Sequence, residues 1–139
     1  EGVQQSAHEQ IASVVTRCLE AVFKEDDYEF KIEFYQARGK TEARLLFVRD
    51  GNEIDPIDAS GGGAVDVASF ALRLSCLILS RPACRRLLVL DEPFRFLSKN
   101  YQPYMREMLE VLSKEFGVQI VLVTHSDILK CGKVITLDR

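Results

Sequence analysis

The sequence predicts an α/β fold in which a helix and an antiparallel meander precede a mainly parallel sheet flanked by helices. Two short apolar runs, residues 87–90 and 118–123, are typical of buried parallel strands, and an amphipathic segment over residues 101–116 separates them. Strand, helix and strand in this order predict a right-handed crossover within one parallel sheet. The chain has 139 residues, 47% hydrophobic and 28% charged, which fits a single globular domain.

The first part of the chain predicts one helix and a meander of strands. Apolar residues recur at three- and four-residue steps over residues 3–24, which indicates an amphipathic helix. This helix has no capping residue at its start, so we interpret it as the continuation of a longer helix. Residues 28–35 alternate apolar and polar side chains, as a half-buried strand does. A hairpin loop over residues 36–40 should lead to a second strand at 43–48, and a further turn to a short extended piece.

The second part of the chain begins with a helix that is apolar on nearly all sides. Residues 65–79 contain two charged side chains, Asp66 and Arg73, so we expect this helix to be buried. Gly117 stands where the C-terminal cap of the 101–116 helix is expected. A further buried strand is predicted over residues 134–137.

The charge and cysteine content argue against several classes of protein. The net charge of −3 disfavours a uniformly basic nucleic-acid-binding domain, although a local basic patch stays open. The longest charge-free apolar stretch, residues 74–80, is too short to span a bilayer, and no signal peptide is visible, so we expect no membrane partner. The cysteines form no CxxC pair and are interpreted as buried or partly buried free thiols in a reducing compartment: Cys18, Cys76, Cys84 and Cys131.

Two carboxylates stand at the end of the first parallel strand. Asp91 and Glu92 directly follow residues 87–90, and ligands bind at the carboxyl ends of the strands in open α/β sheets. The oxygens of Asp91 can hold Mg²⁺, and Glu92 can polarise an attacking water. The alternative is that both side chains simply leave the sheet into solvent.

A histidine stands at the end of the second parallel strand. His125 follows residues 118–123 by two positions and should therefore lie on the same sheet edge as Asp91 and Glu92. A histidine at this place can hydrogen-bond a phosphate or orient a water. An exposed turn histidine with no such role is the alternative.

A glycine-rich segment precedes the apolar helix. Free amides and the positive end of a helix dipole favour an anion near Ser60, Gly61 and Gly62, and glycines let phosphate oxygens approach the backbone. Three glycines in a row are also common in plain flexible loops.

In this order, the three segments resemble the C-terminal half of an ABC-type ATPase head. Ser60-Gly61-Gly62 resembles the signature motif, usually LSGGQ or LSGGE, residues 87–92 resemble the Walker B strand with its catalytic glutamate, and His125 resembles the switch histidine. The motifs cover residues 59–139, and the preceding helix and meander fit less specifically. The chain departs from the family at Gly63, where Gln or Glu is usual, and at Ser98, where the D-loop usually has Asp.

The P-loop expected of an ATPase is missing. Gly39-Lys40-Thr41 looks similar, but Phe34 stands where the first P-loop glycine is required, and the tripeptide joins two meander strands. This organisation resembles the coiled-coil ABC ATPases, which include structural-maintenance-of-chromosomes (SMC) proteins and the ATPase of the double-strand-break repair nuclease. Residues 1–139 would then be one lobe, with a helix leaving the coiled coil (1–25), the meander (26–58) and the subdomain with the signature, Walker B and H-loop motifs (59–139).

The resemblance implies an ATP hydrolase that works with ATP and Mg²⁺ between two heads of a homodimer. It implies that Asp91 binds the metal, that Glu92 and His125 are catalytic, and that the Ser60-Gly61-Gly62 segment binds the nucleotide of the opposite head. An N-terminal P-loop lobe would complete each head, with DNA and a repair nuclease as further partners in the cytoplasm, nucleoid or nucleus. Asp91-Glu92-Pro93 favours the repair branch, and a chromosome-structure SMC lobe or a transporter nucleotide-binding domain are the alternatives.

Overall fold

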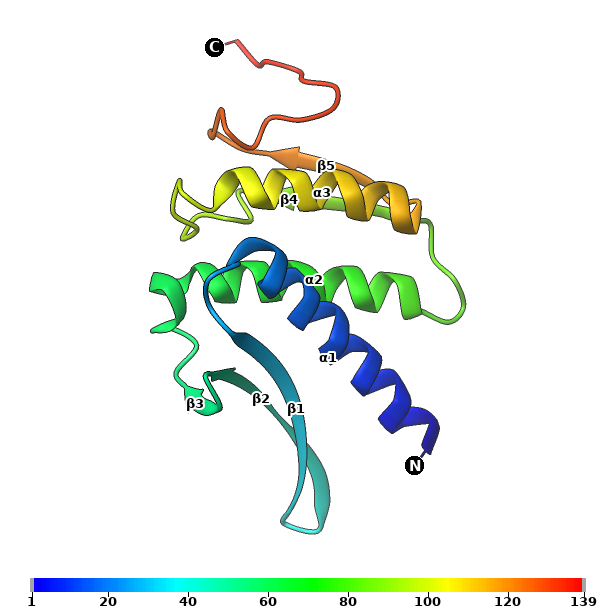
Figure 1. The fold of residues 1–139 in the computed structure, drawn as a ribbon. Helices are drawn as coiled ribbons and strands as arrows, with labels where there is room; N and C mark the ends of the chain where they lie inside the picture. Colours follow the sequence, from blue (N-terminus) through cyan, green and yellow to red (C-terminus); the bar gives the residue numbers. More distant parts are fainter. Residues whose placement is uncertain (1, 139) are drawn as a thin grey trace.

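The computed structural model describes residues 2–138 as a helix and an antiparallel meander followed by helices and a parallel sheet (Figure 1). The α/β prediction is therefore confirmed. The elements in chain order are α1 (Gly2–Val22), β1 (Tyr28–Ala37), β2 (Lys40–Arg49), β3 (Asn52–Ile54), a 3-10 turn (Ala59–Gly62), α2 (Gly63–Leu79), β4 (Leu87–Asp91), α3 (Gln102–Phe116) and β5 (Gln119–Val123).

The meander forms one antiparallel sheet in the order β1-β2-β3. Strands β1 and β2 pair along their whole length, from Tyr28 opposite Arg49 to Ala37 opposite Lys40. Arg38 and Gly39 make the turn with φ angles of 51° and 75°, which matches a tight hairpin whose central residues both need positive φ. The loop predicted over residues 36–40 is therefore shorter than expected. Lys40 opens β2 as an ordinary hairpin residue and belongs to no P-loop.

Helix α2 lies at the centre of the core. Its buried side chains include Val67, Phe70 and Leu74, and it packs against α1, whose Leu19 and Val22 are fully buried. Among the described residues, the segment Ala59–Leu79, which comprises the 3-10 turn and α2, is long and apolar enough to cross a membrane by length and composition alone. The core helix of a soluble protein can be equally long and apolar, and 44% of the 18-residue apolar window within this segment is buried inside the protein.

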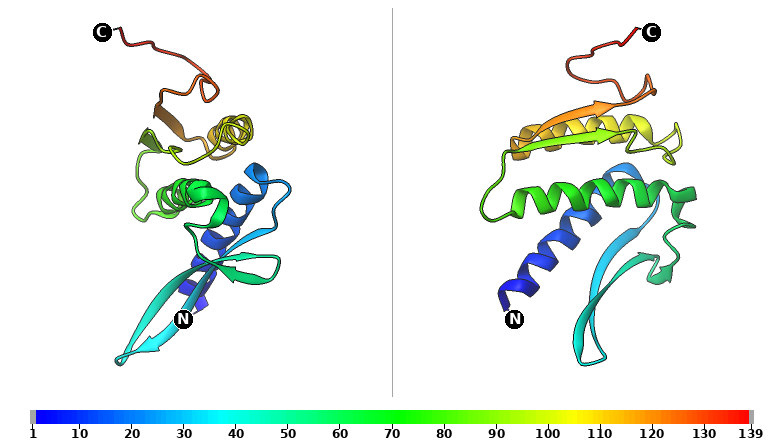
Figure 2. Two further views of the ribbon diagram at one scale, coloured as in Figure 1. Left: turned by 90° about the vertical axis from the view of Figure 1, so that its left-hand side faces the viewer. Right: turned by 180° about the vertical axis from the view of Figure 1, so that it is seen from behind.

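Strands β4 and β5 form a parallel pair, as predicted, and α3 connects them. Gly117 ends α3 in the left-handed conformation, with its backbone N–H donating to the carbonyl of Ser113. Seen from opposite sides in Figures 1 and 2, α3 covers one face of the pair, and the second face has no helix over it within residues 2–138.

Two predictions about this sheet are wrong. Both strands were expected to be buried throughout, but their side chains alternate, and Val89 and Val123 on the uncovered face are 62% and 50% exposed. Residues 134–137 form no strand, because no described segment pairs with them, and their apolar side chains are exposed. Residues 2–138 thus contain a sheet of two parallel strands that is covered on one face.

The cysteines are all free thiols, as predicted, but their burial differs from the prediction. Cys18 is buried and Cys131 is half-buried, whereas Cys76 and Cys84 are exposed. Burial raises the pKa of the Cys18 thiol to about 12 and also raises that of Cys131. Cys76 is exposed because it lies on the outer side of α2, and Cys84 because it lies in the loop before β4. No group of three or more His, Cys, Asp or Glu side chains that could by itself hold a metal ion occurs in the described chain.

Candidate functional site at the carboxyl edge of the parallel sheet

The two predicted carboxylates stand where β4 leaves the sheet. Asp91 is the last residue of β4 and pairs with Val123 of β5, and its side chain is exposed. The register places Asp91 on the same face as Val89, which is the uncovered face. Glu92 donates its backbone N–H to the carbonyl of Val123 at 2.8 Å and has a φ of 44°, an uncommon value for a residue with a side chain. The chain therefore turns sharply at Glu92 and sends the two carboxylates in different directions.

The structure brings Glu92 and His125 together, as the sequence predicts. The backbone N–H of His125 donates to Oε1 of Glu92 at 2.8 Å, and Nε2 of the ring lies 3.5 Å from the same oxygen. The side chain of Glu92 is 31% exposed, whereas the ring of His125 is 97% exposed. Glu92 does not simply extend into solvent, and the ring of His125 is open to a ligand at this edge.

The predicted signature segment forms a 3-10 turn directly before α2. Ser60, Gly61 and Gly62 have successive φ angles of 55°, 63° and 92°, after which α2 begins at Gly63. Gly61 and Gly62 suit this backbone because glycine adopts positive φ without steric cost. The hydroxyl of Ser60 is hydrogen-bonded to the hydroxyl of Tyr28 at 2.8 Å. The Ala59–Gly62 turn is called the glycine turn below.

The glycine turn packs against the segment that follows Glu92. A Cβ on Gly62 would lie 3.4 Å from Cβ of Phe96, and a Cβ on Gly63 would lie 3.3 Å from both the carbonyl oxygen of Phe96 and Cδ1 of Leu97. Gly63 has ordinary helical angles, so close packing and not backbone conformation accounts for glycine here. The departure from the usual Gln or Glu thus coincides with a backbone approach that leaves little room for a side chain.

Asp66 fixes the same contact from the first turn of α2. Its Oδ2 accepts a hydrogen bond from the backbone N–H of Phe96 at 2.7 Å. Burial raises the pKa of this carboxyl, while the hydrogen bond from Phe96 and the charge of Arg95 oppose the rise. The acid therefore ties α2 to the segment between Glu92 and α3.

Gln102 joins this segment to the loop that carries His125. This buried side chain donates from Nε2 to the carbonyl of Leu97 at 3.1 Å, and its Oε1 accepts from Oγ of Ser126 at 2.5 Å. Sequence reasoning missed Tyr28, Asp66 and Gln102. Two of them carried a signal: Asp66 is the single acid of a largely apolar helix, and Gln102 is the first residue of α3, directly before Pro103.

The residues predicted to act on nucleotide therefore occupy two neighbouring places. Glu92 and His125 are in contact at the sheet edge, and Asp91 ends β4 at the same edge. Ser60, Gly61 and Gly62 form a turn joined to that edge through residues 96–102. Asp91 supplies one exposed carboxylate there. Mg²⁺ is commonly bound by one or two protein carboxylates together with substrate phosphates, so this donor set fits the ion in the presence of a nucleotide.

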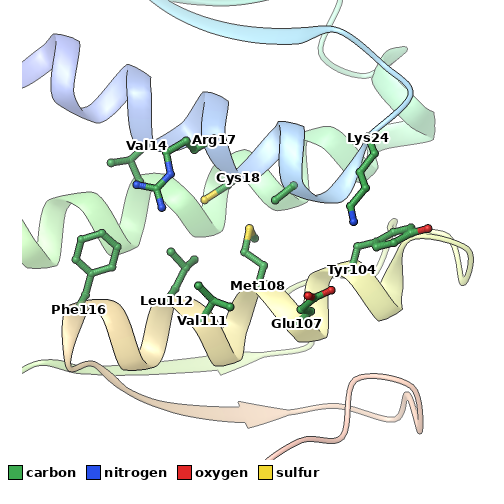
Figure 3. Close-up of a pocket in the computed structure, with 11 residues that line it drawn as sticks. Val14, Arg17, Cys18, Lys24, Tyr104, Glu107, Met108, Val111, Leu112 and Phe116 are labelled. Atoms are coloured by element: carbon green, nitrogen blue, oxygen red, sulfur yellow. The ribbon is translucent and has the colours of Figure 1, made fainter.

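A groove elsewhere on the molecule contains none of these residues. It lies between α1 and α3, with Val14, Cys18 and Phe116 among its apolar lining residues (Figure 3). An ion pair between Arg17 and Glu115 at 3.2 Å borders the groove.

Solved structures of SMC heads resemble the chain. An SMC head bound to the C-winged helix domain of ScpA has a TM-score of 0.64 and 16% identity, over 88% of this chain and 36% of that chain. An SMC ATPase, from work on ATP-driven dimerisation and DNA-stimulated activation, has a TM-score of 0.66 and 15% identity, over 92% of this chain and 74% of that chain. The SMC head domain from Thermotoga maritima has a TM-score of 0.60 and 19% identity, over 89% of this chain and 40% of that chain.

The chain therefore has the fold of part of an SMC head. The predicted likeness to a head of the coiled-coil ABC-type ATPases is confirmed at the level of fold. The chain spans 36% and 40% of two of these SMC-head chains and 74% of the third. No protein-family model and no curated protein matches the sequence.

Proposed function

We propose that the chain is the C-terminal lobe of an ATP hydrolase that acts in DNA repair or recombination. The observation that carries the proposal is the contact of Glu92 with His125 at the carboxyl edge of the parallel sheet, next to Asp91 at the end of β4, within a fold like that of part of an SMC head. Its reaction is the hydrolysis of ATP to ADP and phosphate, in the presence of Mg²⁺, between two heads of a homodimer. An N-terminal P-loop lobe, DNA and a repair nuclease are the other proposed partners.

The residues at the sheet edge have separate roles in this proposal. Asp91 holds Mg²⁺, which neutralises charge on the phosphates. Glu92 accepts a proton from the attacking water, and its anchored Oε1 leaves the second carboxylate oxygen for that task. The exposed ring of His125 hydrogen-bonds the γ-phosphate. Catalysis then depends on positioned charges and hydrogen bonds.

The glycine turn acts on the nucleotide of the opposite head. Ser60 and the amides of Gly61 and Gly62 stand before the N-terminus of α2, where the helix dipole favours an anion. No described contact joins this turn directly to Asp91, Glu92 or His125. That separation is compatible with two half-sites, each completed by the partner head.

The uncovered face of the β4–β5 sheet supports the proposed P-loop lobe. Val89, Val121 and Val123 expose 62%, 43% and 50% of their surface on this face. Parallel sheets occur almost only with both faces covered. A second lobe that packs on these valines would complete the sheet beside Asp91.

The proposal is tested by complementation. The purified chain should show no ATP turnover, and turnover should appear when the P-loop lobe is added. Val121→Glu should abolish this complementation because it places a charge on the uncovered face. Val111→Glu should not, because this exposed valine lies in the groove between α1 and α3, away from the uncovered face. Robust hydrolysis by the isolated chain would overturn the half-site arrangement.

A chromosome-structure SMC head is the second candidate, and the solved SMC heads favour it. The two candidates differ in their partner proteins. The full-length parent protein should bind a nuclease subunit if it is a repair ATPase. Binding of a ScpA-like subunit instead would identify the second candidate.

A further inference from the structure

We propose that Tyr28 is a positioning residue that turns the hydroxyl proton of Ser60 toward an anionic ligand. The inference rests on the proposed function of the glycine turn. It adds a residue from the meander, outside all of the family motifs, to the nucleotide-binding machinery. It also connects the end of α1 to that machinery.

The hydrogen bond between Tyr28 and Ser60 joins distant parts of the chain. The two hydroxyl oxygens lie 2.8 Å apart. Tyr28 opens β1 and is 1% exposed, so its hydroxyl is shielded from water and requires a partner inside the protein. Among the described residues, Ser60 is that partner.

The ring of Tyr28 is held on two sides. Its edge meets the ring of Phe23 with centroids 5.4 Å apart and planes at 80°, and the guanidinium of Arg49 lies 5.5 Å from its centre. Asp26 in turn holds Arg49 through an ion pair of 2.6 Å. A side chain packed in this way has few alternative rotamers, so its hydroxyl presents a fixed partner to Ser60.

Ser60 needs such a partner because of its backbone. Its φ of 55° is unfavourable for a residue with a side chain, and such a conformation persists where neighbouring contacts hold it. The hydrogen bond from Tyr28 is one such contact. It fixes the direction of the Ser60 side chain just before α2 begins.

The chemistry of the pair favours an anion. Either hydroxyl can donate in the free protein. Each hydroxyl has a single proton, so when Ser60 donates to a phosphate oxygen, Tyr28 must donate to Ser60. The resulting chain of hydrogen bonds polarises the Ser60 hydroxyl and strengthens its bond to the anion. No covalent bond forms or breaks in this change.

The same contacts connect the glycine turn to α1. Phe23 directly follows the last residue of α1, is fully buried and touches the ring of Tyr28. A displacement of the α1 end would therefore move the ring and with it the partner of Ser60. This gives the proposed nucleotide site a physical link to the helix that we interpret as leaving a coiled coil.

The test compares Tyr28→Phe with Tyr35→Phe in the full-length protein. Both variants remove one phenol hydroxyl from β1, but Tyr35 bonds Glu42 on the exposed part of the hairpin. Tyr28→Phe should raise amide hydrogen exchange at residues 60–63 by about three- to tenfold, the effect of losing one ordinary hydrogen bond. It should raise the ATP concentration for half-maximal head dimerisation by a similar factor. The turnover number at saturating ATP should change less, because the bond acts on binding.

The outcomes separate this inference from the proposed function. Wild-type protein that does not dimerise with ATP would refute the proposed function and this inference together. If wild-type protein dimerises and Tyr28→Phe has the same ATP dependence, the inference alone fails. If Tyr28→Phe speeds amide hydrogen exchange at residues 60–63 but leaves the ATP dependence of dimerisation unchanged, Tyr28 only stabilises the turn. This result also overturns the positioning role. An equal shift in Tyr35→Phe would overturn it as well.

Discussion

Oε1 of Glu92 accepts the backbone N–H of His125 at 2.8 Å, so the ends of β4 and β5 are joined by a side chain as well as by the sheet. The bond positions one carboxylate oxygen and leaves the other free. A substitution at residue 92 that removes the acceptor should therefore also disturb the His125 loop, whereas a substitution of the His125 side chain keeps the backbone donor of this bond.

Glu92→Gln should separate the chemical role of this carboxylate from its structural role. The amide retains an oxygen acceptor for the His125 N–H but cannot take a proton from water. In the completed head, we expect turnover to fall by about 10²- to 10⁴-fold, the usual contribution of a general base, while ATP-driven dimers accumulate. Single-turnover kinetics and size-exclusion chromatography measure the two effects. Unchanged turnover would refute the catalytic role of Glu92.

Gln102→Leu should destabilise the protein by breaking both bonds of a buried amide. The carbonyl of Leu97 and the hydroxyl of Ser126 would lose their partner, at a cost of about 1–3 kcal/mol for each group left unsatisfied. Gln119→Leu is a suitable control, because this glutamine is exposed. Chemical denaturation measures the difference in unfolding free energy. Equal effects in both variants would mean that the amide bonds contribute nothing specific.

Periodicity predicted most of the elements because each carries its own local pattern. The alternation of residues 28–35, the apolar helix after Gly63 and the glycine that caps α3 all appear in the structure. The shared edge of Asp91, Glu92 and His125 was also predictable, because parallel strands end at the same side of a sheet. The roles of these residues remain predictions.

Other features could not be predicted because they depend on distant neighbours. An apolar run does not reveal whether another strand is available, so residues 134–137 and the exposed face of β4 were misjudged. Gly63 contacts Leu97, which is far away in the sequence, and no local sequence pattern predicts that these two segments meet. The bond between Tyr28 and Ser60 crosses from the meander to the glycine turn for the same reason.

Asp66 should make stability depend on pH. Burial raises its pKa in the folded state, so its contribution to stability is fully present below the ordinary value of 3.8 and is lost as the pH rises through the raised pKa. Asp66→Asn, which keeps an acceptor for the Phe96 N–H, should remove this loss. The free energy of unfolding of the variant should therefore rise relative to wild type from acid to neutral pH. Asp58→Asn, at an exposed acid, is the control, and parallel pH profiles for wild type and Asp66→Asn would contradict the prediction.

Gly63→Gln should restore the usual residue of the signature and yet destabilise this protein. The new Cβ would lie 3.3 Å from the carbonyl oxygen of Phe96 and from Cδ1 of Leu97, and the backbone atom cannot move aside as a side chain can. Insertion of a side chain into such a packed site costs about 1–3 kcal/mol, and the gain in helix propensity over glycine offsets up to about 1 kcal/mol of that cost. Ser69→Gln, on the exposed side of the same helix, should have a small effect. Thermal and chemical denaturation measure the stability of both variants. An unaltered stability for Gly63→Gln would show that Phe96 and Leu97 can shift to accommodate the new side chain without loss of free energy of unfolding.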